Sequence, residues 1–212
     1  MSYSTPEGAK FQYSTTFAGA LNVTAATNAA ESVLSVAAHG LVTDDEFLFM
    51  SGWEDANQSV FRANNLSAGT LGAKSLDTSS TVFYPAGSGV GTIQKISGWL
   101  DIPQVLGINA DGGDAKFTSV EPLSSRNGLQ IPVGFNPGKT TLSLGYDPTN
   151  ATYKAMLALG RNYTKVALRI IGGGGAIYGY GYMSTSEVPK MSKGNVNTVD
   201  CVLSFQGRTI GY

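Results

Sequence analysis

Apolar and polar residues alternate with a period of two along most of the readable stretches of the chain, as they do in β-strands with one buried and one wet face. In the cleanest run, 198–206, one side carries Val199, Cys201, Leu203 and Phe205, and the other carries Thr198, Asp200, Val202 and Ser204. Stretches 140–146 and 163–171 alternate in the same way. The pattern predicts antiparallel, half-exposed strands and a mainly β fold of the sandwich or barrel type.

A run of four glycines, Gly172 to Gly175, separates the strand patterns 163–171 and 176–183. Glycine adopts the positive φ angles that tight connections need, so the run predicts a hairpin tip. The second strand places Tyr178, Tyr180 and Tyr182 on one face with glycines opposite. We expect this broad aromatic face to pack against another sheet or another subunit.

One helix is predicted, at about 150–160. Asn150 offers an N-cap, Tyr153, Met156 and Leu157 follow at helical spacing, and Gly160 offers a stop. The apolar stripe is typical of a short helix packed on a sheet.

Residues 31–97 differ from the rest because short strand patterns follow one another at close spacing, at 32–37, 46–51, 59–63, 69–76 and 91–96. Glycine and asparagine turns separate them, as in small antiparallel barrels. The sequence therefore predicts a small β-barrel module at 31–97, inserted into a discontinuous domain made of 1–30 and 98–212.

The segment from Asn109 to Pro137 is rich in Gly, Ser and Asn and contains the isolated apolar residues Phe117, Leu129, Ile131 and Phe135. Loops of this length are usually functional or disordered. We expect a loop that is flexible in the isolated subunit and becomes an arm on a neighbouring subunit or ring, with those four residues as contacts.

Charged residues make up only 14% of the 212-residue chain, against about 25% in typical globular proteins. The 14 Lys and Arg residues are scattered and balanced by 15 Asp and Glu, which argues against a nucleic-acid-binding protein that grips phosphates through a basic cluster. No apolar run approaches the ~20 residues of a membrane span, and no signal peptide is recognisable. We expect synthesis in the cytoplasm and no membrane partner.

The sequence offers no catalytic constellation. His39 is the one histidine and sits in a turn pattern, while Cys201, the one cysteine, falls on the apolar side of its strand. The stretch Asp111 to Asp114 lacks the spacing and the distal glutamate of a calcium loop. We therefore expect no enzymatic activity, no cofactor and no metal.

The order of elements after residue 98 resembles that of the major tail tube proteins of long, flexible-tailed bacteriophages. The resemblance covers about 98–212 and the opening Phe11 to Thr27. It depends on the order of the helix at 150–159, the strand pair 163–171 and 176–183, and a set of short motifs around them. These motifs are Val120–Ser125, Gly134, Gly138, Tyr146-Asp147-Pro148, Met183-Ser184-Thr185-Ser186, Gly194, Val196 and Ser204–Gly207. Residues 31–97 resemble small β modules of phage virion proteins. The motifs that support this resemblance are Ala38-His39-Gly40-Leu41, Asp45-Glu46-Phe47, Ser51-Gly52, Phe61, Thr70-Leu71 and Leu76–Ser79. The chain departs from the usual pattern in having Asp44-Asp45 where these modules have a Gly-Asp turn.

The resemblance implies a structural virion protein that forms hexameric rings, which stack into the tail tube that delivers the genome. Its partners would be further copies of itself and the tape measure, terminator and distal tail proteins, and DNA would pass without tight binding. Two strand faces are candidates for the lumen wall, and we favour the one with Asp200 and Ser204 over the one with Lys165 and Arg169, because a neutral or acidic wall does not hold phosphate.

Two other functions remain open at this stage. A carbohydrate- or receptor-binding β-sandwich, such as a virion decoration protein, would use the tyrosine face as a stacking platform. A tube protein of a contractile tail would share the fold and require an outer sheath, which an inserted module would crowd.

Overall fold

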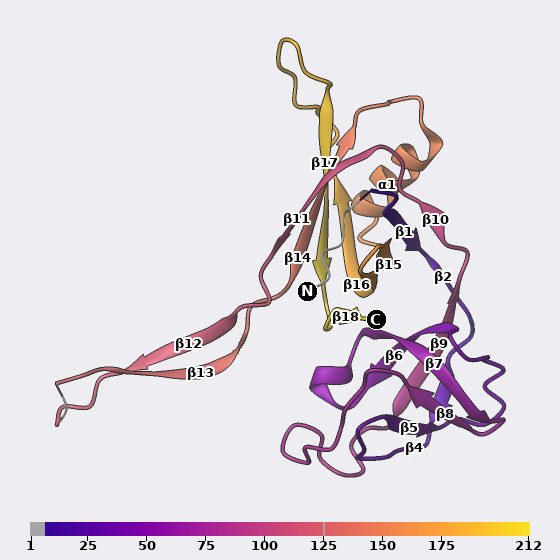
Figure 1. Ribbon diagram of the computed structural model, residues 1–212, viewed down its shortest axis with the longest axis vertical. Coiled ribbons are helices and arrows are strands. Elements are labelled where there is room, and N and C mark those ends of the chain that lie inside the picture. The colour runs from indigo at the N-terminus through magenta and orange to yellow at the C-terminus, as the bar shows by residue number, and fades with distance from the viewer. Residues whose placement is uncertain (1–6, 125) are drawn as a thin grey trace.

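The computed structural model describes residues 7–124 and 126–212, which form two β units stacked along the long axis of the molecule (Figure 1). The helix-bearing unit has an antiparallel sheet in the order β10-β1-β15-β16-β17-β14-β11, with β18 beside β16. Its strands are β1 (Lys10–Ser14), β10 (Leu100–Asp101), β11 (Val105–Asp111), β14 (Lys139–Gly145), β15 (Lys165–Gly172), β16 (Gly175–Thr185), β17 (Thr198–Phe205) and β18 (Ile210–Gly211).

The other unit, called the barrel unit here, has the strand order β2-β9-β6-β7-β8-β5-β4. Its strands are β2 (Thr16–Phe17), β3 (Leu21–Val23), β4 (Ala25–Ala26), β5 (Ser32–Ser35), β6 (Glu46–Ser51), β7 (Ser59–Ser67), β8 (Thr70–Ala73) and β9 (Gly91–Ser97), with the 3-10 turn η1 (Glu54–Ala56) between β6 and β7. The barrel closes because the chain at 21–26 pairs with β9 through β3 and with β5 through β4. The pairing thus reaches back to Thr16, outside the range 31–97 expected from the sequence.

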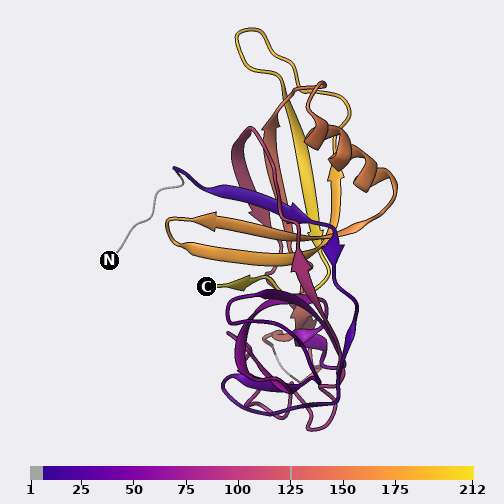
Figure 2. The ribbon, with the colours of Figure 1, turned by 90° about the vertical axis from the view of Figure 1, so that its right-hand side faces the viewer.

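The core of the helix-bearing unit lies inside a bent sheet. The β15–β16 hairpin crosses the direction of β17 and β14, so the apolar faces of the two halves meet (Figure 2). Tyr13 and Leu168 from one half and Leu142 and Cys201 from the other belong to one buried cluster. The predicted alternation of 198–206 is confirmed, since β17 is buried at every second residue. The chain is mainly β, as predicted.

The one α-helix of the described residues, α1 (Ala151–Arg161), closes this core and confirms the predicted helix. The Asn150 side chain accepts hydrogen bonds from the backbone N–H groups of Thr152 and Tyr153, at 2.8 and 3.1 Å. Met156 is buried in the same cluster as Leu142. The helix is far too short to cross a bilayer, and no other helix in the described parts of the chain could do so.

The two units meet through an apolar junction. Tyr178 and Ala167 of the helix-bearing unit are buried together with Leu48, Val60 and Ile96 of the barrel unit. The predicted hairpin exists, with Gly172 paired to Gly175. Of the two partners expected for the tyrosine face, the structure provides another sheet of the same chain.

The segment expected to be a loop is instead a β-ribbon. Strands β12 (Ala115–Val120) and β13 (Leu129–Phe135) pair with each other alone and project away from both units (Figure 1). Composition was misleading here because Leu129, Ile131, Val133 and Phe135 alternate with a period of two, which favours a strand. We call β12 and β13 the arm.

Candidate assembly surfaces

One outer face of the bent sheet is uncovered and polar. Directly paired residues of antiparallel strands lie on the same face. Asn109, Thr141 and Val202 form one such row across β11, β14 and β17, and Ser143 and Asp200 form the next. Lys139 and Ser204 form a third row. All of these residues are exposed or half-buried, and Val202 is the one apolar residue among them.

The charges of this open face are matched. Lys190, from the loop before β17, places its Nζ 2.6 Å from an Asp200 carboxylate oxygen. Lys139 lies 4.0 Å from Asp111 at the other end of the strands. Lys190 and Lys139 therefore each have a carboxylate partner. The two residues selected from the sequence, Asp200 and Ser204, both lie here. The sequence also placed Thr141 and Ser143 on a wet strand face, but that they and Asn109 lie beside Asp200 and Ser204 depends on strand register.

The competing strand face is closed by the barrel unit. Arg169 Nη1 lies 2.6 Å from Glu46 Oε1 of β6, and its Nε and Nη2 donate to Gln12 Oε1 at 2.9 and 2.6 Å. The guanidinium also lies over the Trp99 ring, 4.4 Å from its centroid. The charged side chains of Arg169 and Glu46 are only 18% and 15% exposed.

Lys165 also makes its contacts at the junction between the two units. Its Nζ donates to Gln58 Oε1 at 2.7 Å and lies over the rings of Tyr180 and Tyr182. Both basic residues of β15 thus serve contacts within the chain. The sequence placed them on one face correctly, but it could not reveal which unit covers that face.

The open face and the face covered by the barrel unit belong to one side of the sheet, because direct pairing joins Lys165, Tyr182, Ser204 and Lys139 in one row. The sheet bends at β16, so the outer face of the β1–β15 half and the outer face of the β17–β14 half point in different directions (Figure 2). The first carries the barrel unit through Ala167 and Tyr178. The second carries the polar rows and leads directly into the arm through β11 and β14.

The arm has apolar side chains on both faces. Val120 pairs with Leu129 on one face, next to Ile131, while Phe117 pairs with Pro132 on the other. All four residues expected from the sequence as contacts are on the arm and strongly exposed: Phe117 at 53%, Leu129 at 58%, Ile131 at 47% and Phe135 at 76%. A ribbon with two exposed apolar faces is typical of a segment that another chain covers.

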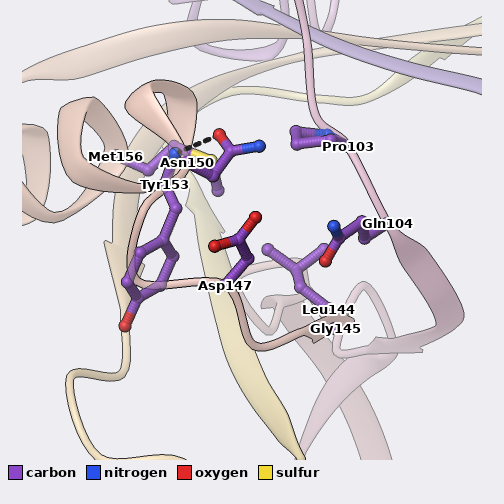
Figure 3. A pocket seen from close by; sticks show the side chains of 8 residues that line it. All are labelled: Pro103, Gln104, Leu144, Gly145, Asp147, Asn150, Tyr153 and Met156. Carbon is purple, nitrogen blue, oxygen red and sulfur yellow. Dashed lines mark hydrogen bonds between the residues drawn. The ribbon is translucent and has the colours of Figure 1, made fainter.

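Two hollows in the described parts of the chain are small or shallow. One gap, beside the N-terminus of α1, holds about 10 Å³ and is lined by Pro103, Gln104, Leu144, Gly145, Asp147, Asn150, Tyr153 and Met156 (Figure 3). That is room for about one water molecule. An open cleft of about 520 Å³ on the barrel unit is lined by Leu21, Asn22, Thr24, Ser35, Val36, Ala37 and Gly69, with no charged side chain.

His39 and Cys201 both have structural roles, His39 through hydrogen bonds in a turn and Cys201 through burial in the core. The Leu41 N–H donates to His39 Nδ1 at 3.1 Å, so Nε2 carries the proton and donates to the Ser67 carbonyl at 2.7 Å. Burial raises the pKa of Cys201 to about 11, which keeps it a thiol at neutral pH. Within 7–124 and 126–212, no three His, Cys, Asp or Glu side chains gather to hold a metal ion.

Comparisons with known proteins find a matching family and similar solved structures. The family described as phage tail tube protein, TTP, matches residues 51–212, about three quarters of the chain. A chain from the virion of a native gene transfer agent particle is similar in structure, with a TM-score of 0.41 and 11% identity, covering 54% of this chain and 88% of that one. No curated protein matches. On the family match, the chain belongs to the phage tail tube protein family.

Proposed function

We propose that this protein is the major tail tube subunit of a long, flexible phage tail, and that it forms hexameric rings stacked into a conduit for the genome. Family membership and the open polar face of β17, β14 and β11 support this proposal. The subunit is made in the host cytoplasm and ends in the virion, where the tape measure, terminator and distal tail proteins are its further partners.

In this proposal the open face lines the lumen, with Asp200 and Ser204 among its residues. DNA-binding proteins derive much of their affinity from lysine and arginine side chains that replace phosphate counterions. On the open face, Lys190 and Lys139 stand beside carboxylates instead. Arg169, the rival candidate, is held by Glu46 and Gln12. A wall of Ser, Thr, Asn and paired charges lets duplex DNA slide.

The barrel unit, which packs on the β1–β15 half, then lies on the outside of the tube, because a lumen that passes duplex DNA has no room for a further globular unit. The strand pairing supports a division of the chain into 16–97 for this unit and the remainder for the tube wall. A globular unit in this position would crowd an outer sheath, which favours a flexible over a contractile tail.

The arm contacts a neighbouring subunit or ring through Phe117, Leu129, Ile131 and Phe135. Strand β11 is an edge of the sheet and exposes unpaired backbone groups. Edges of this kind promote aggregation unless another strand or chain covers them. Ring closure covers them in an ordered way.

The alternative function, a carbohydrate-binding sandwich, is disfavoured because its expected binding surface is covered. Its stacking platform was the tyrosine face, but Tyr178 is buried at the junction and Tyr180 packs edge-on against Phe17. The aromatic surface that would bind a sugar ring is occupied within the chain.

Electron microscopy of the concentrated, purified protein tests the proposal. We expect hollow tubes with a regular axial repeat, and we expect Leu129→Asp combined with Ile131→Asp to prevent them by placing charges in the arm contact. The matched control is Val82→Asp, at a position that is 82% exposed on the barrel unit, and it should leave tubes intact. A protein that stays monomeric at every concentration would contradict the proposal.

A further inference from the structure

The chain crosses between the helix-bearing unit and the barrel unit at 14–16 and again at 97–99. The two crossings lie side by side, because Thr16 pairs with Ser97 and the Ser14 hydroxyl donates to the Ser97 carbonyl. Two adjacent connections fix the distance between the units but leave them free to rotate about one line. A few residues outside regular elements are enough to absorb such a rotation. The crossings therefore have the geometry of a hinge.

The last residues of the chain, 206–212, form a further connection between the units, which we call the strap. The strap includes β18, which lies between the two units near the label C in Figure 1. On the helix-bearing unit, β18 pairs with Ile177 and Tyr178 of β16. The backbones of Tyr212 and Ala176 exchange two hydrogen bonds, of 2.9 and 3.0 Å. The strap is thus held to β16 as a short edge strand.

The strap also binds the barrel unit. The Arg208 N–H donates to the Ser59 hydroxyl at 3.1 Å. The Tyr212 hydroxyl accepts from the Arg62 N–H at 2.8 Å and donates to the Lys74 carbonyl at 2.9 Å. The Arg62 guanidinium lies over the Tyr212 ring, 5.3 Å from its centroid. One side chain of the strap thereby joins β7 to the residue that follows β8.

The strap passes very close to the backbone of the barrel unit. A Cβ atom on Gly207 would lie 2.3 Å from the Gln58 carbonyl oxygen and 2.5 Å from the Asn57 carbonyl oxygen. Glycine is the residue that permits such a close approach. Any larger residue at 207 would push the strap off the barrel unit.

The strap covers the apolar junction as well. Tyr212 packs against the buried cluster that contains Tyr178 and Ala167, and its ring meets the Tyr178 ring edge-on with 5.6 Å between the centroids. Burial raises the pKa of the Tyr212 phenol to about 12, so the phenol remains a hydrogen-bond donor at neutral pH. Interfaces between units of one chain usually allow relative motion unless they are large and apolar. Loss of Tyr212 would uncover Tyr178 and weaken the contact that remains.

The strap is attached at a distance from the crossings on both units. Strand β16 lies two strands from β1 in one sheet, and β7 lies two strands from β9 in the other. At about 4.8 Å per strand, the offset is roughly 10 Å on each unit. An attachment that is displaced from a hinge line resists rotation about that line.

We propose that the strap is a latch that holds the barrel unit in one orientation, with Tyr212 as its anchor and the two crossings as the hinge. When the strap is released, the barrel unit swings on the crossings while both units keep their cores. The inference concerns the single chain and does not depend on assembly into tubes. It is therefore tested on the purified subunit.

Distance measurements between the units test the latch. Spin labels are attached to Ala25→Cys on β4 and Ala155→Cys on α1, both exposed positions, and the buried Cys201 stays unlabelled. Double electron–electron resonance should give one narrow distance in the doubly labelled parent protein. We expect a broad distribution for a chain that stops after Gln206, and for Gly207→Val and Tyr212→Ala in the full-length chain.

Two variants serve as controls for the distance measurement. Thr209→Ala changes an exposed side chain of the same strap and should leave the distance narrow. Tyr212→Phe keeps the ring but loses the hydroxyl bonds to Arg62 and Lys74, so its distribution should be intermediate. A narrow, unchanged distance in the shortened chain would overturn the proposal. Loss of the β-sheet circular dichroism in that chain would overturn it too, because the strap would then be part of a core.

Hydrogen exchange of the unmodified protein gives a second, independent test. Opening of the latch exposes the N–H groups of Arg62 and Ala176, which both bond to Tyr212. Local opening requires less free energy than unfolding of a central strand. We expect these two N–H groups to exchange faster than those of β14 by on the order of ten-fold or more. Equal protection of the two sets would mean that the strap opens only when the whole protein unfolds, and would overturn the proposal.

Discussion

At the residue scale, the most buried ion pair of the described residues joins the two units through Arg169 and Glu46, 2.6 Å apart. Removing one partner of such a pair leaves an uncompensated buried charge, which costs about 3 kcal/mol. We expect Glu46→Gln to lower the free energy of unfolding by about that amount in urea titrations. The control is Glu187→Gln, which breaks an exposed pair with Arg161 and should cost less than about 1 kcal/mol. Equal losses in the two variants would contradict this account.

Cys201 gives the protein a specific sensitivity to alkaline pH. Burial raises the pKa of its thiol from 9.0 to about 11, so between these values the unfolded chain loses a proton that the folded chain keeps. The contribution of the buried thiol to the free energy of unfolding is complete below pH 9 and is lost as the pH rises from 9 to 11. The free energy of unfolding of the wild type, relative to that of Cys201→Ala, should therefore be lower at pH 10 than at pH 8 by about 1 kcal/mol. A constant difference would mean that the thiol ionises equally in both states.

Single residues could be placed on a face from the sequence, but their partners could not. Alternation alone put Asp200 and Ser204 on the wet side of their strand, where the structure has them. The same logic put Lys165 and Arg169 on a wet side, yet Gln58 and Glu46, more than 100 positions away, cover them. Periodicity reports which side of a strand is polar and carries no information on which distant element covers it.

At the element scale, α1 depends on its N-cap because the Asn150 side chain satisfies two otherwise unpaired N–H groups. We expect Asn150→Ala to lower the free energy of unfolding by about 1 kcal/mol, measured by urea denaturation. Asn150→Asp should retain most of the stability, since a carboxylate accepts the same bonds and interacts favourably with the helix N-terminus. A loss in Asn150→Asp as large as in Asn150→Ala would mean that the cap is not the cause.

Elements with strong local patterns were predictable, and those made by long-range pairing were not. The helix and the strands around 140–146, 163–171 and 198–206 lie within a few residues of their expected places. The arm was predicted as a loop and not as a ribbon, because the interpretation relied on its glycine and serine content and not on the alternation in β13. Strands β2 to β4 were missed because each has three residues or fewer and is defined only by its pairing with β9 or β5.

At the scale of the whole molecule, the barrel unit should be removable. The Ser14 hydroxyl donates to the Ser97 carbonyl, and Thr16 pairs with Ser97. The two segments in which the chain passes between the units therefore lie side by side, and a short linker can replace 16–97. Removal uncovers Tyr178 and Ala167, so we expect increased binding of an apolar dye, with tube formation preserved. Substituting Tyr178→Ser in the shortened protein should reduce dye binding. A shortened protein that folds cleanly but never assembles would show that the barrel unit is part of the wall.

The identity of the lumen wall can be tested through DNA affinity. Because non-specific binding draws its free energy from counterions released by Lys and Arg, unmodified tubes should not bind short duplexes at physiological salt. Ser204→Arg places a cation on the open face of every subunit and should create binding that weakens as salt is raised, with a slope of about −0.9 in log–log form for each phosphate contacted. The control is Thr81→Arg, an exposed position on the barrel unit that we place on the outside.

Both variants add the same charge, so their comparison isolates position. On the outside of a tube, DNA meets a convex surface and touches few subunits at once. In the lumen, each duplex is surrounded by the whole ring and meets an arginine from every subunit, which multiplies the number of phosphates contacted and steepens the salt dependence. We therefore expect a markedly steeper salt slope for Ser204→Arg than for Thr81→Arg. The reverse order, or tight binding by unmodified tubes, would place a different strand face against the DNA.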